Sequence, residues 1–241
     1  HMSRDIAADI QRIKLFQTEP HPCSYLPGRE STTAFVDPDL AVDPEVYERL
    51  SMVGFRRSGP YLYAPMCSAC KACVPVRLPV AAFKPTRAQK RCLKRNMDLK
   101  VVRCKSIDSD QHYLLYAKYI NERHADGDMY PPSKTQFDQF LGDPWECTQY
   151  LEFYLDHQLI GCAVVDVLPD SLSAIYTYFD PAHDRRGLGN LAVLLQIKIA
   201  AEMGKRYVYL GYWIEDCQKM SYKKQYQPIE LFEENSWDLS K

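Results

Sequence analysis

Three strand-like runs in the second half of the chain constrain its fold more than any other feature. They cover residues 150–156, 159–167 and 172–179 and read YLEFYLD, LIGCAVVDV and LSAIYTYF. The connections between them, HQ and LPDS, are short enough to join neighbouring antiparallel strands. The sequence therefore predicts an antiparallel meander in this half of the chain.

Helical patterns flank the meander on both sides. Apolar residues recur with helical spacing over 108–124, and a second short helix fits 133–141. After the third strand, the turn DRRGLGN opens an apolar helix that ends at Gly204, and a strand follows over 205–213. The predicted order is helix, helix, three strands, glycine turn, helix and strand. This order resembles the core of the GNAT-type acyltransferases.

The glycine turn differs from the turn that the GNAT resemblance implies. That turn has Gln or Arg, two residues, Gly, one residue, then Gly or Ala, and it binds the pyrophosphate of an acyl-CoA at a helix N-terminus. Gly187 and Gly189 match the two glycine positions, but Asp184 stands at the first position. A carboxylate repels a pyrophosphate, so we expect the fold without coenzyme A.

The first half combines a capped helix with strands around a cysteine loop. A helix is predicted to begin at Pro44, with Asp43 as its N-cap. The alternating runs PYLYAP and VPVRLPV predict strands on either side of the loop. We expect an α/β (α+β) protein with an N-terminal cysteine-containing domain over 3–105 and a GNAT-type transferase domain over 106–241.

Basic residues are concentrated in one segment of a chain whose formal net charge is −1. Between residues 84 and 105 the only acidic residue is Asp98. Five cations there have the spacing of a single helical stripe, namely Arg87, Lys90, Arg91, Lys94 and Arg95. Such a stripe on an otherwise acidic chain favours a polyanionic partner. A solvated helix face is the simpler alternative.

Matching stretches that run through nearly the whole chain indicate a specific family. They read CSYLPGRES, GFRRSG, CSACKACVPVRLPV, AQKRCLKRN, YINERHADGDM, LSAIYTYFDP, YVYLGYWI and KMSYKKQYQPIEL, in this order. The chain thereby resembles the bacterial leucyl-tRNA–protein transferases, also called aspartate/glutamate leucyltransferases, which are related to the eukaryotic arginyl-tRNA–protein transferases. One departure is RRGLGN, which replaces the family's usual Ser-Leu-Gly followed by Thr.

The resemblance implies a reaction. Leucine leaves the 3′ end of leucyl-tRNA and forms a peptide bond with the N-terminal amine of a protein that begins with Asp or Glu, which marks that protein for the N-degron pathway. Arginyl transfer to the same acceptors and a non-enzymatic tRNA-binding module stay open as alternatives, and so does an acetyl-CoA-dependent acetyltransferase. The aminoacyl ester is already activated, so the chemistry requires no cofactor.

Nine cysteines in a chain without a recognisable export signal favour reduced thiols in the cytoplasm. Three of them, Cys67, Cys70 and Cys73, lie in one loop, and Cys23 or His21 is a candidate fourth ligand of a zinc site. The resemblance to the eukaryotic relatives implies an iron–sulfur centre as a second kind of metal site at these cysteines. Packed thiols lining a pocket are the alternative. No apolar run is long enough to cross a membrane, and the oligomeric state stays open.

The implied chemistry suggests roles for further residues. Aromatic side chains beside cations suit unstacked terminal nucleotides of a tRNA, and such residues are Trp213, Lys219, Tyr222 and Lys223. Packing of an ordinary strand end is the alternative explanation for this segment.

An acceptor that begins with Asp or Glu needs a cation for its carboxylate. Arg77 is the first candidate, followed by Arg29 and Lys90. Asp166 is a candidate base or amine holder, and Tyr176 and Tyr178 are candidates for positioning the ester or the leaving hydroxyl. For each of these residues a purely structural role is the alternative.

Overall fold

A computed structural model describes residues 13–67 and 71–240. In this part of the chain, an eight-stranded sheet forms the centre of the molecule. Its strands, in spatial order, are β14 (Ser236–Leu239), β13 (Glu230–Glu233), β7 (Val74–Pro79), β12 (Tyr207–Trp213), β11 (Ser171–Phe179), β10 (Gln158–Val167), β9 (Thr148–Leu155) and β8 (Lys100–Cys104). Only the β11–β12 pair is parallel among these described strands.

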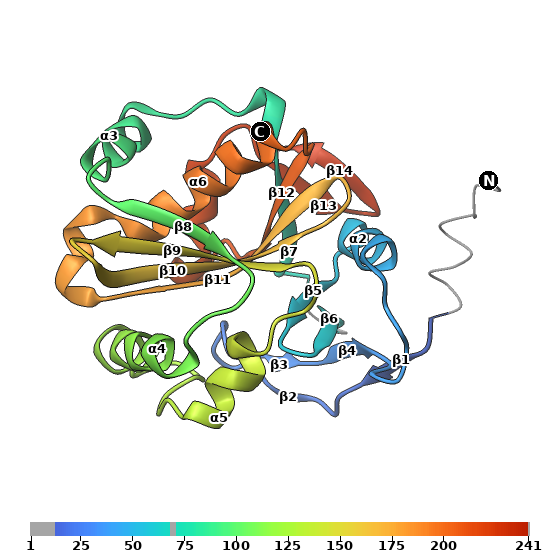
Figure 1. The fold of residues 1–241 in the computed structure, drawn as a ribbon. Coiled ribbons are helices and arrows are strands. Elements are labelled where there is room, and N and C mark those ends of the chain that lie inside the picture. Colours follow the sequence, from blue (N-terminus) through green and yellow to red (C-terminus); the bar gives the residue numbers. More distant parts are fainter. Residues whose placement is uncertain (1–12, 68–70, 241) are drawn as a thin grey trace.

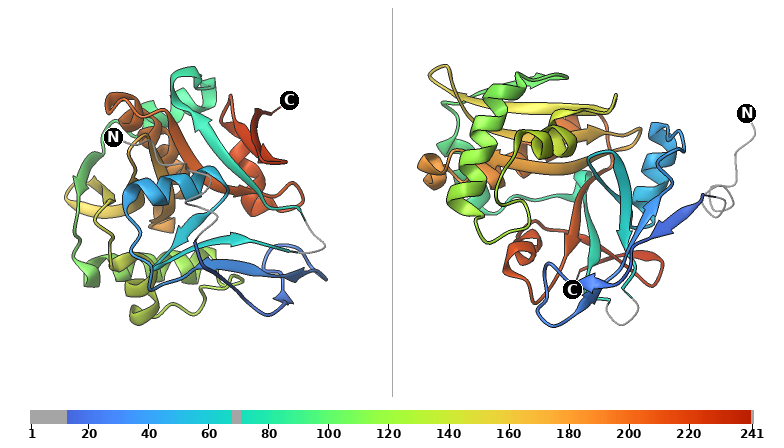
Figure 2. Two further views of the ribbon diagram at one scale, coloured as in Figure 1. Left: turned by 90° about the vertical axis from the view of Figure 1, so that its right-hand side faces the viewer. Right: turned by 90° about the horizontal axis from the view of Figure 1, so that it is seen from below.

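A smaller antiparallel sheet lies to one side of the large one (Figures 1 and 2). Its strands are β1 (Leu15–Gln17), β4 (Thr33–Val36), β6 (Tyr61–Pro65) and β5 (Arg56–Ser58). A short ribbon pairs β2 (His21–Pro22) with β3 (Glu30–Ser31). Helix α2 (Pro44–Met52) begins as predicted, because the side chain of Asp43 accepts a hydrogen bond from the Val46 N–H at 2.8 Å.

Helices cover both faces of the large sheet, as Figure 1 shows. One face carries α6 (Leu188–Glu202), with α3 (Arg87–Arg95) packed on it. The short α7 (Gln218–Ser221) and a 3₁₀ turn (Tyr222–Gln225) come after β12 in the chain and contact that strand. The other carries α4 (Ser109–Arg123), α5 (Lys134–Phe137) and a short π-helix (Asp138–Gly142). Because α6 lies between the sheet and α3, most of its side chains are buried, which explains its nearly continuous apolar sequence.

The predicted meander is confirmed. Strand β10 pairs antiparallel with both β9 and β11. The β9–β10 turn is tight, with positive φ angles of 48° at Asp156 and 70° at His157, the conformation that suits two-residue hairpins. The chain then crosses through α6 to reach β12, parallel to β11. This is the GNAT-type order that the sequence predicts, within a mixed α/β fold.

The large sheet contains strands from both halves of the chain. Strand β7 inserts between β12 and β13, and β8 forms the edge beside β9. The predicted domain boundary near residue 105 comes directly after β8, so it does not separate two independent sheets. None of the described helices is both long and apolar enough to span a lipid bilayer.

Candidate functional site

The parallel strands β11 and β12 separate after three paired positions. The pairs run from Ser171 with Tyr207 to Ser173 with Tyr209, and the remaining residues of these two described strands do not pair with each other. A β-bulge at this point of β12 precedes Gly211, whose φ is +84°. Unpaired backbone groups can bind a substrate, and ligands of open α/β sheets bind beyond the carboxyl ends of the strands. The opening between β11 and β12 is therefore the candidate active site.

Aromatic side chains stand on both strands beyond the separation. Tyr176 on β11 is half-buried, and its ring centroid lies 6.3 Å from that of Tyr119 on α4. On β12, Trp213 has the Nζ atom of Lys224 at 4.0 Å from its ring centroid. Burial raises the pKa of Tyr176, so its hydroxyl keeps its proton, and this hydroxyl makes no hydrogen bond to the described residues. Tyr176 therefore stays a candidate for contacting the ester.

Tyr178, predicted to act beside Tyr176, is instead part of a buried network. Its hydroxyl lies 2.7 Å from Nδ1 of His112, and Nε2 of His112 lies 2.6 Å from Glu152. Both Tyr178 and His112 are completely buried, and burial lowers the pKa of His112. A buried phenol whose hydroxyl is already paired with a histidine has no free group to offer a substrate. We therefore assign Tyr178 to packing beneath the site.

Asp166, like Tyr178, is buried and paired with other side chains of the protein. Its carboxylate is completely buried and accepts hydrogen bonds from Nε and Nη2 of Arg57 at 2.6 and 2.8 Å. The hydroxyls of Tyr47 and Thr148 donate to it as well. Both oxygens are therefore occupied, and no acceptor amine can approach them. The arrangement favours the structural alternative for Asp166 over the prediction that it holds or deprotonates the amine.

Arg77 is similarly engaged by the protein itself. Its Nε lies 2.8 Å from Glu230, and its Cζ lies 3.7 Å from the ring centroid of Tyr207 and 4.2 Å from that of Trp237. Its Nη1 also donates to the Tyr209 hydroxyl at 3.3 Å, so a carboxylate, a phenol and two aromatic rings of the protein itself engage this guanidinium. This geometry favours the structural alternative for Arg77 over the prediction that it recognises the acceptor. Arg29, the next candidate, lies on the surface of the loop between β2 and β3.

The predicted cationic helix is confirmed as α3, with the capping box of Thr86 and Gln89 at its start. All five stripe residues are exposed to solvent. The opposite side of α3 packs on the glycine turn, where Asn96 Nδ2 donates to the Arg186 carbonyl at 2.8 Å and Cys92 Sγ lies 3.5 Å from the Gly187 carbonyl. The stripe, including Lys90, therefore faces outward beside the start of α6. Its binding to tRNA stays a prediction.

The later aromatic and basic segment lies next to α3. Gln89 of α3 donates to the Gln225 carbonyl at 3.0 Å, so the two predicted tRNA-binding segments are neighbours. Tyr222 and Lys219 are exposed, and Lys219 lies 3.5 Å from Asp126. Lys223 differs, because it is buried and its Nζ donates to the Tyr212 carbonyl at 2.6 Å. Lys223 is thus not placed to contact a phosphate on the surface.

The glycine turn has its own ion pair. Asp184, which was predicted to disfavour a pyrophosphate, forms an exposed ion pair with Arg123 of α4. Gly187 has a φ of +64°, and helix α6 begins after it without a side-chain cap. The helix N-terminus is thus flanked by a carboxylate and covered on one side by α3.

The described cysteines do not form a ligand set. Cys23 and Cys73 pack in one apolar cluster with Leu26 and Ile214, whereas Cys67 Sγ lies 3.7 Å from the Ser31 hydroxyl. No group of three or more His, Cys, Asp or Glu side chains is arranged to hold a metal within the described ranges. Cys70 lies outside those ranges. A metal at this loop therefore stays a prediction, and no step of the chemistry below depends on it.

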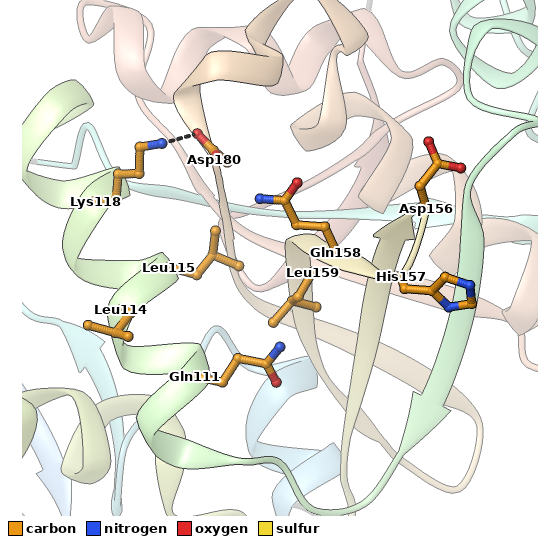
Figure 3. A pocket seen from close by; sticks show the side chains of 9 residues that line it. All are labelled: Gln111, Leu114, Leu115, Lys118, Asp156, His157, Gln158, Leu159 and Asp180. Carbon is orange, nitrogen blue, oxygen red and sulfur yellow. Dashed lines mark ion pairs between the residues drawn. The ribbon is translucent and has the colours of Figure 1, made fainter.

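A separate groove of ≈ 560 Å³ lies between α4 and the β9–β10 turn (Figure 3). Aliphatic and amide side chains line most of it, and an ion pair joins Lys118 Nζ to Asp180 Oδ1 over 2.8 Å. None of the side chains that line this groove belongs to the predicted site. We therefore place the chemistry at the opening between β11 and β12 instead.

Sequence reasoning missed two buried arginines. Arg56 and Arg57 are adjacent on β5, and both are buried against the large sheet. The motif GFRRSG contains them, but no role was predicted for either residue. Two adjacent arginines after a glycine and a phenylalanine were the available signal, since arginine is rarely buried without a partner.

Solved structures with similar folds are distant. FemX covers 90% of this chain and 83% of its own at 9% identity, with a TM-score of 0.49. A GCN5-related N-acetyltransferase from Kribbella flavida covers 93% of this chain and 91% of its own at 11% identity, with a TM-score of 0.41. Similarities at this level carry no functional inference.

Sequence relatives are much closer. Models described as arginine-tRNA-protein transferase, N terminus and C terminus, match residues 21–91 and 111–233. The aspartate/glutamate leucyltransferase of Saccharophagus degradans is 53% identical over 230 residues, which span 95% of this chain and 98% of that protein. The enzyme of the same name from Pseudomonas fluorescens is 51% identical over 95% of this chain and 97% of its own. The chain therefore belongs to the arginine-tRNA–protein transferase family, in the group that contains the aspartate/glutamate leucyltransferases.

Proposed function

We propose that this protein transfers leucine from leucyl-tRNA to the N-terminal amine of proteins that begin with Asp or Glu. The observation that carries the proposal is the similarity to aspartate/glutamate leucyltransferases at about half identity over nearly the whole chain. The names of these relatives favour leucine over arginine as the transferred residue. We expect the reaction to take place in the cytoplasm and its product to enter the N-degron pathway.

The chemistry needs little covalent work from the protein. The aminoacyl ester is already activated, so the site has to align the amine, accept its proton and stabilise the tetrahedral oxyanion. Backbone N–H groups freed where β11 and β12 separate are suitable donors to an oxyanion. An α-amine has a pKa of about 8, so a water chain can remove its proton. No cofactor enters this scheme.

Tyr176 is the side chain best placed to act on the ester. It lies on β11 beyond the separation, its phenol stays protonated, and its hydroxyl has no hydrogen-bond partner in the described ranges. In this role it donates a hydrogen bond to the oxygen of the leaving ribose.

The tRNA binds across α3 and the segment beside it. The exposed stripe neutralises phosphates of the acceptor arm, and this interaction supplies affinity without base specificity. The terminal nucleotides stack on exposed Tyr222 and on Trp213, whose ring already lies beside a lysine. This arrangement directs the 3′ end of the tRNA toward the opening between β11 and β12.

The test is a transfer assay with separately charged tRNAs. Leucyl-tRNA and arginyl-tRNA are each incubated with the protein and with peptides that differ only in a first residue of Asp, Glu, Asn or Ala, and the products are identified by mass. We expect leucine to be added to the Asp and Glu peptides alone. Addition of arginine, or binding of tRNA without any product, would contradict the proposal. A Tyr176→Phe variant should transfer more slowly while it binds leucyl-tRNA as the parent does.

A further inference from the structure

Arg56 is a buried cation with two unused hydrogen-bond donors. The residue is only 4% exposed, and its Nη1 donates to the carbonyls of Ser51 and Phe55 at 3.0 and 2.6 Å. Its Nε and Nη2 have no partner within the described part of the chain. A buried guanidinium edge without an acceptor is costly. The arrangement therefore indicates that an anion completes it.

A second buried cation lies close to the first. Lys223 is 6% exposed, and its Nζ donates to the Tyr212 carbonyl at 2.6 Å, lies 3.4 Å from the Met220 sulfur and lies 6.0 Å from the ring centroid of Tyr222. Burial, together with the positive charge of Arg56, lowers the pKa of Lys223 to about 7, and Cys217 opposes this shift. Among the described residues, no carboxylate pairs with either cation. Two like charges without a counterion are a further sign of an anion site.

The two cations lie beside the candidate active site. Cζ of Arg56 lies 4.8 Å from the ring centroid of Tyr209, the last residue of β12 that pairs with β11. A Cβ atom built on Gly211, just after the bulge, would lie 3.5 Å from the Nζ of Lys223. The hydroxyl of Ser173, which is paired with Tyr209, is also buried and lacks a partner among the described residues. Paired positions point to the same face of a sheet, so Ser173 and Arg56 share one side of β12.

We propose that Arg56 and Lys223 bind the side-chain carboxylate of the first residue of the acceptor protein. The proposal rests on the proposed function and assigns the residues that choose Asp and Glu. Arg57 shows the geometry within this same protein, because its Nε and Nη2 hold the two carboxylate oxygens of Asp166. Arg56 offers the same edge, still unoccupied by the described residues. A planar carboxylate accepts two parallel hydrogen bonds from this forked edge of an arginine, whereas the ammonium group of a lysine acts only as a point charge.

A carboxylate fits this place better than a tRNA phosphate does. The Arg56 donors are enclosed between aromatic rings, and its Cζ lies 5.7 Å from the Tyr212 ring centroid in addition to the Tyr209 contact. The cations suited to a hydrated phosphate chain are instead exposed on α3. Because the Arg56 donors are covered in this structure, the acceptor has to move the covering side chains as it binds.

The test compares peptides that differ only by the charge of their first residue. Arg56→Lys keeps the charge but removes the fork, and Arg103→Lys, on the exposed edge strand β8, is the matched control. With leucyl-tRNA as donor, we expect Arg56→Lys to lower kcat/KM for an Asp peptide by about 100-fold and to leave the slow rate with an Asn peptide nearly unchanged. The control should keep the parent's preference for Asp over Asn.

A retained preference in Arg56→Lys would overturn the proposal, and so would weaker binding of leucyl-tRNA with the preference intact. An equal fall for both peptides would indicate damage to the fold and would likewise remove the support for a specificity role. These outcomes are separate from a failure of the proposed function, in which the parent protein itself transfers no leucine to Asp peptides.

A second measurement follows the binding of peptides without tRNA, first to the parent protein and then to a Lys223 variant. Above pH 7 most of Lys223 is neutral, and a bound carboxylate favours its protonation. Calorimetry at pH 8 in two buffers of different ionisation enthalpy should therefore show more proton uptake with an Asp peptide than with an Asn peptide, by up to about one proton per site. Lys223→Met should abolish the difference. Equal uptake with the two peptides would remove Lys223 from the proposed site.

Discussion

Replacement of Asp166 by Asn tests whether this residue stabilises the fold or acts on the substrate. The carboxylate accepts two hydrogen bonds from Arg57 and one each from Tyr47 and Thr148. An asparagine side chain has nearly the same shape, but one of its two oxygens becomes an NH₂ donor. In either orientation of the amide, two of the four donors then lose their acceptor, and the charge of Arg57 is left buried without a counterion.

The expected loss in the free energy of unfolding follows from this geometry. Removal of one partner from a buried ion pair destabilises a protein by about 3–5 kcal/mol, which is a large part of a total stability of about 5–15 kcal/mol. Asp170→Asn is the matched control, since Asp170 lies at the surface at 3.5 Å from Arg206. An exposed pair of this kind contributes at most about 1 kcal/mol.

Urea unfolding followed by tryptophan fluorescence measures the effect, because the ring centroid of Trp145 lies 5.1 Å from Cζ of Arg57. Arg57→Met should cost a similar amount as Asp166→Asn. The double variant should cost clearly less than the sum, since neither charge is then left unpaired. At a low temperature at which Asp166→Asn stays folded, we expect kcat/KM for leucyl transfer to remain close to that of the parent. A variant of parental stability that has lost transfer would refute the structural role and return Asp166 to the chemistry.

Four further predictions concern other charged or metal-binding groups. Replacement of the stripe residues Lys90, Arg91, Lys94 and Arg95 by Gln should reduce the slope of log K against log salt for tRNA by about 0.7–0.9 per lost phosphate contact; an unchanged slope moves the tRNA site elsewhere. Arg77→Ala should lower the free energy of unfolding by about 3 kcal/mol, because it removes a buried guanidinium and leaves Glu230, whose side chain is 16% exposed, unpaired; the ratio of transfer to Asp and Ala peptides should stay the same. Because the unfolded chain binds the Lys223 proton more tightly than the folded protein does, stability should rise with pH above about 7, and Lys223→Met should flatten this rise in urea titrations. If the cysteine loop holds a metal, metal analysis should find stoichiometric zinc or iron that Cys23→Ser releases, whereas fully active metal-free protein would leave the thiols as packing.

Local patterns in the sequence were sufficient to predict the order of the elements. The meander, the apolar helix α6 and the cationic helix α3 each follow from spacing within a short stretch, because periods of two and of 3.6 residues are set by the backbone itself. The capping groups of α2 and α3 are local in the same sense, since a cap and its partner are three residues apart. The outward-facing stripe on α3 therefore appears in the structure as the sequence predicts.

The roles of the buried charges were decided by tertiary structure alone. Asp166 meets Arg57 across 109 positions of the chain, and Arg77 meets Glu230 across 153 positions. Each of these side chains has the chemistry of a catalytic or binding group, and no local pattern shows that a distant partner occupies it. Arg56 is the converse case. It is the same residue type as Arg57 and adjacent to it, so the sequence does not distinguish the two, yet two of its donor atoms have no partner in the described chain. Burial and pairing depend on which segments the fold brings together, and a carboxylate or guanidinium is available to a substrate only where that packing leaves it unpaired.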